Sequence, residues 1–138
     1  MAIDMTARNV QDEAKRKGLP WTIAKGFDTF LPLSDFITKE QLLDPHDAML
    51  HLSVNDTVRQ EDSTGLMLFR IPQLLASITQ VMRLEAGDMV LSGTPKGVGQ
   101  VVPGDVLRAA VSVAGRPLAQ SVQVDVVQGQ GRYEYRAT

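Results

Sequence analysis

The stretch LHLSVNDTVRQ, residues 50–60, decides the fold class of this chain. Residues 50–54 alternate apolar and polar side chains, and this period of two is typical of a strand that buries one face. The pair Asn55-Asp56 is a turn sequence, and residues 57–60 can return as a second strand beside the first. The stretch therefore predicts a β-hairpin.

Further strand patterns follow on the C-terminal side of the hairpin. Strand-forming residues occupy 89–91, 106–113 and 118–127, and turn sequences at 103–105 and 114–117 separate the runs. Before them, Ile71-Pro72 opens a helix, because proline fits the first helical turn and apolar residues recur at helical spacing as far as Met82. We expect a β-meander in the C-terminal half, followed by a polar tail at 128–136 on the surface or against a partner.

The N-terminal side of the hairpin is expected to contain one helix and much irregular chain. Helical spacing covers residues 6–17, with Thr6 as the N-cap and Gly18 as the residue that ends the helix. The segments after this helix contain prolines and follow neither period, so only a short extended piece is expected at 22–25. The pattern as a whole predicts a mixed β fold with few helices.

Composition bounds the class of protein. The 138 residues are 43% hydrophobic and 22% charged, which is typical of one soluble globular domain. The formal net charge of -2 offers no positive field for nucleic acid, and the apolar runs are far shorter than the ~20 residues of a membrane span. We therefore expect no nucleic-acid or membrane partner, and the N-terminus shows no targeting pattern. Without cysteine, a metal must bind carboxylates, carbonyls or the two histidines, a set that suits Mg²⁺.

Asp4 stands immediately before the predicted first helix, where an aspartate has two interpretations. Its carboxylate can cap the backbone N–H groups of the helix, or it can bind a metal ion. A Mg²⁺ site usually has more than one oxygen ligand from the protein or its substrate, and no partner carboxylate is evident nearby. The residues alone favour the cap and leave the metal ligand as the alternative.

Four further residues could bind an anionic substrate. Arg8 and Gln11 are three positions apart and therefore point to one side of the first helix, near the end that favours anions. Lys25 lies among apolar or small residues, so it is either partly desolvated and suited to oxyanion stabilisation, or it extends to water. Thr94 offers a hydroxyl within the glycine-rich segment 93–99. The simpler interpretations are a polar helix face for the pair and a wide turn for the segment.

Neither the two histidines nor the charged residues 59–62 are expected to take part in binding or catalysis. His46 and His51 have no second histidine or cysteine at ligand spacing, so we expect both at the surface. Residues 59–62 are most simply the charged end of the hairpin. The segment 93–99 lacks the residue order of a phosphate-binding loop and leads into extended chain rather than a helix.

Six segments, taken together, resemble the fumarylacetoacetate hydrolase family. They are Ala2-Ile3-Asp4-Met5-Thr6-Ala7-Arg8-Asn9-Val10-Gln11, Lys25-Gly26-Phe27-Asp28-Thr29, Val54-Asn55-Asp56, Arg59-Gln60, Leu84-Glu85-Ala86-Gly87-Asp88 and Leu91-Ser92-Gly93-Thr94-Pro95-Lys96-Gly97-Val98-Gly99. Residues 11–21 and the ending Tyr133-Glu134-Tyr135-Arg136 resemble its mitochondrial acylpyruvase branch, described as oxaloacetate tautomerase and decarboxylase, particularly the fungal members.

The resemblance implies a β-roll or β-sandwich fold of the family's type, one Mg²⁺ or Mn²⁺ ion, a homodimer, and a mitochondrial location with the cytoplasm as alternative. The implied substrate is a small 2-oxo acid, converted through an enolate by acylpyruvate hydrolysis or by oxaloacetate tautomerisation or decarboxylation. By residue-by-residue transfer, Asp4 is a metal ligand and Lys25 is the catalytic lysine beside the metal-bound oxygens. Arg8, Gln11 and Thr94, with Lys25, contact the substrate.

One departure from the family bears on activity. Family members carry a Glu-x-Glu metal pair and a His-Glu acid/base dyad upstream of the segment that corresponds to Asp4, and this sequence contains no Glu-x-Glu. We therefore expect residues 1–138 to be the C-terminal portion of a single catalytic domain, inactive alone. The alternative is an inactive β module that dimerises or binds a partner. The alternating valines of 106–127, which one helix barely covers, also favour a dimer.

Overall fold

A four-stranded antiparallel sheet, in the order β2-β1-β3-β4, is the framework of the chain. The structure is a computed structural model that describes residues 1–136. The strands are β1 (Met49–Val54), β2 (Thr57–Ser63), β3 (Val106–Val113) and β4 (Arg116–Asp125). The helices are α1 (Arg8–Arg16), α2 (Thr22–Lys25) and α3 (Ile71–Thr79), with a 3₁₀ turn η1 (Thr64–Leu66). The expected mixed β fold with few helices is confirmed.

The sheet consists of two hairpins side by side rather than a meander. Asn55 and Asp56 close β1–β2 with positive φ angles of 50° and 64°, as the turn sequence predicts. The second hairpin, β3–β4, lies beside the first because β1 pairs with β3 from Met49 opposite Ser112 to Val54 opposite Leu107. The predicted strand at 89–91 is wrong: within the described chain these residues join no ladder, and their segment is held by a side chain of β2 instead.

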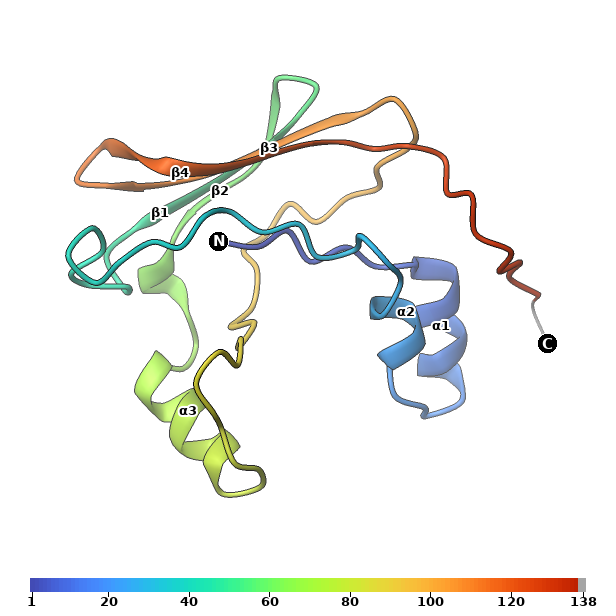
Figure 1. The fold of residues 1–138 in the computed structure, drawn as a ribbon, viewed down its shortest axis with the longest axis horizontal. Coiled ribbons are helices and arrows are strands. Elements are labelled where there is room, and N and C mark those ends of the chain that lie inside the picture. Colours follow the sequence, from blue (N-terminus) through green and yellow to red (C-terminus); the bar gives the residue numbers. More distant parts are fainter. Residues whose placement is uncertain (137–138) are drawn as a thin grey trace.

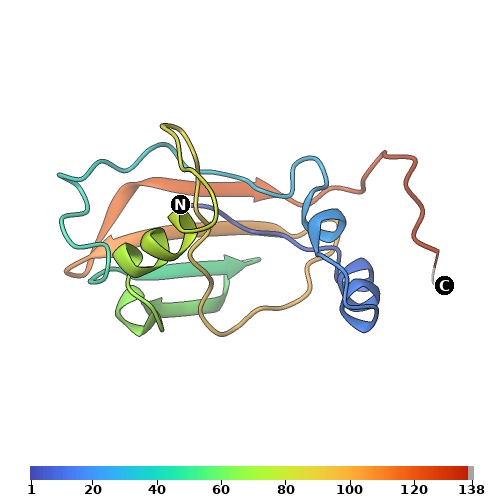
Figure 2. The same ribbon diagram turned by 90° about the horizontal axis from the view of Figure 1, so that it is seen from below.

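One face of the sheet carries most of the core. The buried apolar side chains on it are Val54, Leu107, Ala109, Val111 and Val122. Irregular segments and helices lie on one side of the sheet, as both views show (Figures 1 and 2). Val111 and Val122 are each only 4% exposed, so this chain already covers two of the valines on which the expected dimer partly rested. That argument for a dimer is therefore weakened.

The helices lie at two ends of the same layer. Figure 1 shows α1 beside α2 at one end and α3 at the other. The residue before α1 is Ala7, which makes no side-chain cap, so the predicted Thr6 cap is wrong. The expected extended piece at 22–25 is one helical turn, which is too short for its period to be visible in the sequence. Throughout the described chain, each helix is too short or too polar to span a lipid bilayer.

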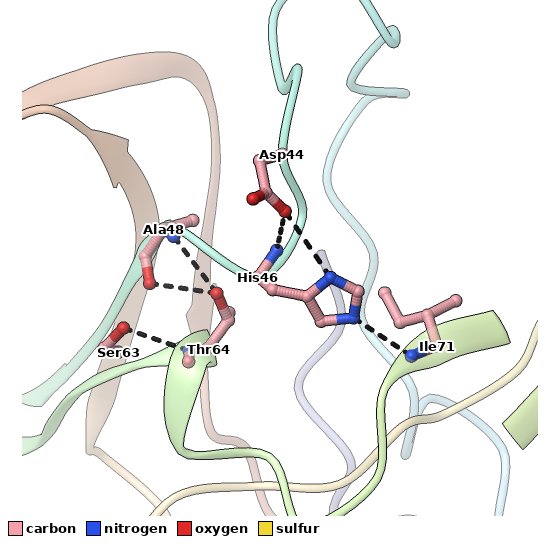
Figure 3. Close-up of polar contacts among 7 residues, drawn as sticks. Asp44, His46, Ala48, Ser63, Thr64 and Ile71 are labelled. Carbon is pink, nitrogen blue, oxygen red and sulfur yellow. Dashed lines mark hydrogen bonds and ion pairs between the residues drawn. The ribbon is translucent and has the colours of Figure 1, made fainter. Parts of the chain in front are cut away.

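A polar cluster joins the segment before β1 to the start of α3 (Figure 3). The backbone N–H of Ile71 donates to Nε2 of His46 over 3.0 Å, and Nδ1 of His46 lies 3.4 Å from Oδ1 of Asp44. Nearby, the Thr64 hydroxyl accepts from the N–H of Ala48 and donates to its carbonyl. His46 has a side chain only 12% exposed, so its predicted surface position is wrong, because α3 returns to it from 25 residues along the chain.

The turn before β3 is connected to the β1–β2 turn through Asp105. The Asp105 carboxylate accepts hydrogen bonds from the Val102 backbone N–H at 2.8 Å and from the Asn55 side-chain amide at 2.7 Å. These two donors lower the pKa of Asp105, because they stabilise its charged form. The carboxylate therefore helps to align the two hairpins.

Candidate functional site

The ion pair between Asp4 and Lys25 is the centre of the candidate site. Nζ of Lys25 lies 2.7 Å from Oδ2 of Asp4, although the residues are 21 positions apart. The backbone brings them together, since the N–H of Ala7 donates to the carbonyl of Ala24 over 2.9 Å and so joins the start of α1 to α2. Asp4 therefore pairs with the lysine instead of capping α1.

Lys25 is not enclosed by apolar side chains as its neighbours in sequence suggested. Its side chain is 33% exposed, and Ile23, two residues before it, is 66% exposed. Ala24 between them is buried. Lys25 is thus held by its carboxylate partner at the protein surface, with its ammonium accessible to a ligand.

Arg8 and Gln11 form a second polar pair on α1. Nη1 of Arg8 donates to Oε1 of Gln11 over 3.0 Å, as the three-residue spacing predicts. Gln11 is 7% exposed, so its side chain is fixed, and it directs the Arg8 guanidinium at the start of the helix. We call these four residues, Asp4, Arg8, Gln11 and Lys25, the α1–α2 corner. The corner presents two cations, an amide and the Asp4 carboxylate, and its two cations suit an anionic ligand.

A divalent cation has only a partial ligand set in these residues. Within residues 1–136, no group of three or more acidic or histidine side chains could hold a metal ion. Asp4 contributes one carboxylate, and Lys25 already occupies one of its oxygens. Because Mg²⁺ requires six oxygen ligands in near-octahedral geometry, the described donors do not make a metal site on their own.

Thr94 lies in a second polar cluster, against β2. Its Oγ1 accepts a hydrogen bond from Nε2 of Gln60 at 2.9 Å. Among the described residues, no hydrogen bond or ion pair joins Thr94 to the α1–α2 corner. The convergence of Thr94 with Asp4 and Lys25 in one pocket therefore stays a prediction.

Gln60 is the residue that sequence reasoning missed, because it was assigned to a charged hairpin end. Its Cα lies opposite Leu52, and this register places both side chains on the core face of the sheet. A polar residue at an inward position was the available signal, since a half-buried amide must find hydrogen-bond partners. Its partners lie 34 to 36 positions away, which no local pattern reveals.

Two hollows on the sheet lie apart from the candidate residues. Their volumes are about 310 and 210 Å³, and both are lined by His51 and Ala110 on the other face of the sheet. None of Asp4, Arg8, Gln11, Lys25 or Thr94 lines either hollow. The hollow of about 310 Å³ is also lined by Glu61, which lies opposite His51 in the β1–β2 ladder. The candidate site is placed at the corner because most of the residues that the resemblance implies lie there.

Comparison with protein families gives one match that covers most of the chain. The family described as "Fumarylacetoacetate (FAA) hydrolase C-terminal" matches residues 1–127. The chain is 59% identical over 114 residues to the oxaloacetate tautomerase oaa1, mitochondrial, of Schizosaccharomyces pombe, covering 83% of this chain and 52% of that protein. It is 42% identical over 127 residues to the oxaloacetate decarboxylase, mitochondrial, of Dictyostelium discoideum, covering 92% of this chain and 56% of that protein. The chain thus spans about half the length of the curated relatives it matches.

Solved structures agree with this similarity. A yeast fumarylacetoacetate hydrolase family protein, ynq8, superimposes with a TM-score of 0.92 at 41% identity, over 99% of this chain and 58% of that one. The fumarylpyruvate hydrolase of Pseudomonas aeruginosa, solved in complex with Mn²⁺ and pyruvate, superimposes with a TM-score of 0.83 at 29% identity. The match covers 93% of this chain and 53% of that one. The expected fungal and mitochondrial resemblance agrees with the names of the relatives.

Proposed function

The chain belongs to the fumarylacetoacetate hydrolase family, and from this we propose that it is the C-terminal portion of a single catalytic domain of an enzyme that acts on 2-oxo acids. The proposed reaction passes through an enolate, as oxaloacetate tautomerisation, oxaloacetate decarboxylation or acylpyruvate hydrolysis. The relatives named above are an oxaloacetate tautomerase, an oxaloacetate decarboxylase and a fumarylpyruvate hydrolase. Deprotonation or carbon–carbon cleavage next to a ketone leaves an enolate in each reaction type.

The observation that carries the proposal is the contact between Lys25 and Asp4, beside the Arg8–Gln11 pair. A 2-oxo acid has a carboxylate that is charged from the outset and a keto oxygen that becomes negative in the enolate. The Lys25 ammonium is suited to stabilise the keto oxygen, because it is held at a defined point. Arg8 and Gln11, with Thr94, are suited to bind the carboxylate.

We propose that the complete protein uses one divalent cation, Mg²⁺ or Mn²⁺, with Asp4 as one ligand and further carboxylates from outside residues 1–136. The Mn²⁺ and pyruvate in the fumarylpyruvate hydrolase structure support this proposal. Such an ion polarises a ketone as a Lewis acid. A mitochondrial location and a homodimer are proposed from the same relationship.

The test is turnover by the full-length protein with oxaloacetate, acetylpyruvate and fumarylpyruvate. Tautomerisation is followed by the ultraviolet absorbance of the enol, and the other two reactions by release of pyruvate. Asp4→Asn and Lys25→Met are each expected to lower kcat/KM by at least a hundredfold, while Asp12→Asn and Lys15→Met on the exposed face of α1 serve as matched controls. Equal effects in the variants and their controls would refute the assignment of the corner.

A second candidate function is a β module without activity, and the partial metal ligand set favours it. The same assays separate the two. An inactive module predicts no turnover of any of the three substrates by the full-length protein, with or without added Mg²⁺ or Mn²⁺. Turnover that disappears with Lys25→Met would exclude it.

A further inference from the structure

The hydrogen bonds that hold the segment carrying Thr94 come from one side chain. Within the described chain, residues 89–101 make no backbone–backbone hydrogen bonds to other parts of the protein. The two N–H protons of Gln60 Nε2 are shared among three acceptors: Oγ1 of Thr94 at 2.9 Å, the carbonyl of Pro95 at 2.8 Å and that of Lys96 at 3.2 Å. The remaining polar contact is an ion pair of 3.5 Å between Lys96 and Asp62, and the Lys96 side chain is 85% exposed. The Asp62 side chain is only 17% exposed, but water screens the exposed ammonium of Lys96, so the pair contributes little.

Gln60 is itself firmly placed. It belongs to β2, where its Cα lies opposite Leu52 in the ladder with β1. The backbone of the same segment passes so close to β2 that a side chain at Gly97 would overlap the carbonyl oxygen of Arg59. The amide of Gln60 is therefore a fixed donor, and the segment fits closely around it.

The direction of the hydrogen bond determines what the Thr94 hydroxyl can do. A hydroxyl has one proton to donate and two lone pairs that accept. Because the Gln60 amide donates to Oγ1, one lone pair is occupied and the proton stays available for another acceptor. A carboxylate is an acceptor only, so a hydroxyl arranged in this way is matched to it.

We propose that Gln60 is a positioning residue, which holds the Thr94 hydroxyl as a hydrogen-bond donor to the carboxylate of the 2-oxo acid. The inference rests on the proposed function for the identity of the ligand. Gln60 does not touch the substrate and acts only through Thr94 and the backbone of residues 94–96. The substrate carboxylate is charged throughout the reaction. Loss of the Gln60 amide should therefore weaken substrate binding more than it slows the chemical step.

The first experiment compares Gln60→Met with wild type in the full-length protein, with Gln123→Met on the exposed side of β4 as control. We expect Gln60→Met to raise KM, and the Kd of oxalate as an unreactive probe, at least tenfold, with kcat changed less than threefold. In a Thr94→Val background the same change should raise KM less than twofold. The positioning role would be overturned if Gln60→Met raised KM equally in the wild-type and Thr94→Val backgrounds, or if it lowered only kcat.

Gln60→Glu provides a readout that a merely structural role would not move. The glutamate carboxylate accepts but does not donate, so at neutral pH it repels the carbonyls of Pro95 and Lys96 and takes the Thr94 proton for itself. Protonation at lower pH restores a donor. We expect the KM of Gln60→Glu, relative to wild type at the same pH, to fall as the pH is lowered, while the relative KM of Gln60→Met stays constant. The proposal would be contradicted if the KM of Gln60→Glu, divided by the wild-type KM at the same pH, did not change with pH either.

A third measurement does not depend on activity. Trypsin cleaves after Lys96 only when the segment leaves β2, so Gln60→Met should speed this cleavage at least tenfold, and Gln123→Met should not. If cleavage is faster but the wild type turns over no 2-oxo acid, the placement of the segment stands and the proposed function fails. If cleavage and KM are both unchanged while the wild type is active, the function stands and the role of Gln60 is refuted.

Discussion

Replacing Gly97 with alanine is expected to displace residues 89–101 from β2 and to remove the Thr94 hydroxyl from its position. Gly97 has a φ angle of +97°, in the region that residues with a side chain rarely adopt. A Cβ there would overlap the carbonyl oxygen of Arg59 and would lie 2.9 Å from its carbonyl carbon and 3.2 Å from Cγ of Gln60. The obstacle is the backbone of β2 at Arg59, which lies at the register shift between Val58 and Gln60, two residues that are paired with β1.

The magnitude has two parts. A positive φ costs a residue with a side chain about 1–2 kcal/mol. To restore ordinary contacts of about 3.5–4.0 Å with the Arg59 carbonyl oxygen, the segment must move by roughly 2 Å, which would break the Gln60 contacts of 2.8 to 3.2 Å. The Gln60 amide nitrogen has two protons to donate, so at about 0.5–1.5 kcal/mol for each hydrogen bond the loss adds about 1–3 kcal/mol. We therefore expect docking of the segment to weaken by about 2–5 kcal/mol in total.

Two other glycines provide controls matched in backbone angle. Gly87 and Gly104 have φ angles of +99° and +98°, and a Cβ added at either meets nothing within 4 Å. Their alanine variants should therefore show only the angular cost, about 1–2 kcal/mol in the free energy of unfolding. Gly97→Ala alone should also speed trypsin cleavage after Lys96 and lower kcat/KM at least thirtyfold. If the three variants gave the same cleavage rates and kinetics, the close passage of this segment against Arg59 would be refuted.

Three other predictions concern the corner, the core and the turn before β3. Lys25→Met should lower kcat more than it raises KM, because its ammonium opposes charge that grows on the enolate oxygen, and Arg8→Ala should mainly raise KM; steady-state kinetics showing the reverse pattern would exchange their roles. Leu107→Ala should lower the free energy of unfolding by about 2–5 kcal/mol, whereas Leu43→Ala, 87% exposed, should change it by less than about 0.5 kcal/mol; similar denaturation curves would contradict the core assignment. Hydrogen bonds lower the pKa of Asp105 in the folded state. The carboxylate therefore stabilises the fold at a pH above its pKa in the unfolded chain, and this stabilisation is lost as the pH falls through its pKa in the folded protein. Below about pH 4, the free energy of unfolding should therefore fall less steeply with decreasing pH in Asp105→Asn than in wild type. An unchanged slope would exclude a contribution of Asp105 to stability.

Local pattern was sufficient where the interacting residues are close in sequence. The alternation in residues 50–54 and the Asn55-Asp56 turn predict the first hairpin, and the structure confirms it. Pro72 and the apolar spacing after it predict α3, which begins at Ile71 and ends at Thr79, three residues before the predicted limit. The Arg8–Gln11 contact follows from spacing on a single helix.

Short elements and segments without a period of their own were beyond local pattern. Residues 22–25 form one turn of helix, which is too short for its period to be visible, and residues 89–91 join no ladder within the described chain. The Thr6 cap failed because of a distant contact. The backbone of Ala7 is held by Ala24, and this contact determines where α1 begins.

The sequence by itself determined the fold class, the first hairpin, the presence of α1 and α3 and, through its motifs, the family. Only the tertiary structure decided the strand order β2-β1-β3-β4, the pairing of Lys25 with Asp4, and the hold of Gln60 on the segment that carries Thr94. The physical reason is range. Hydrophobic periodicity and turn preferences act over a few residues, whereas these contacts join groups 21 to 63 positions apart and depend on how the sheet and its connections pack.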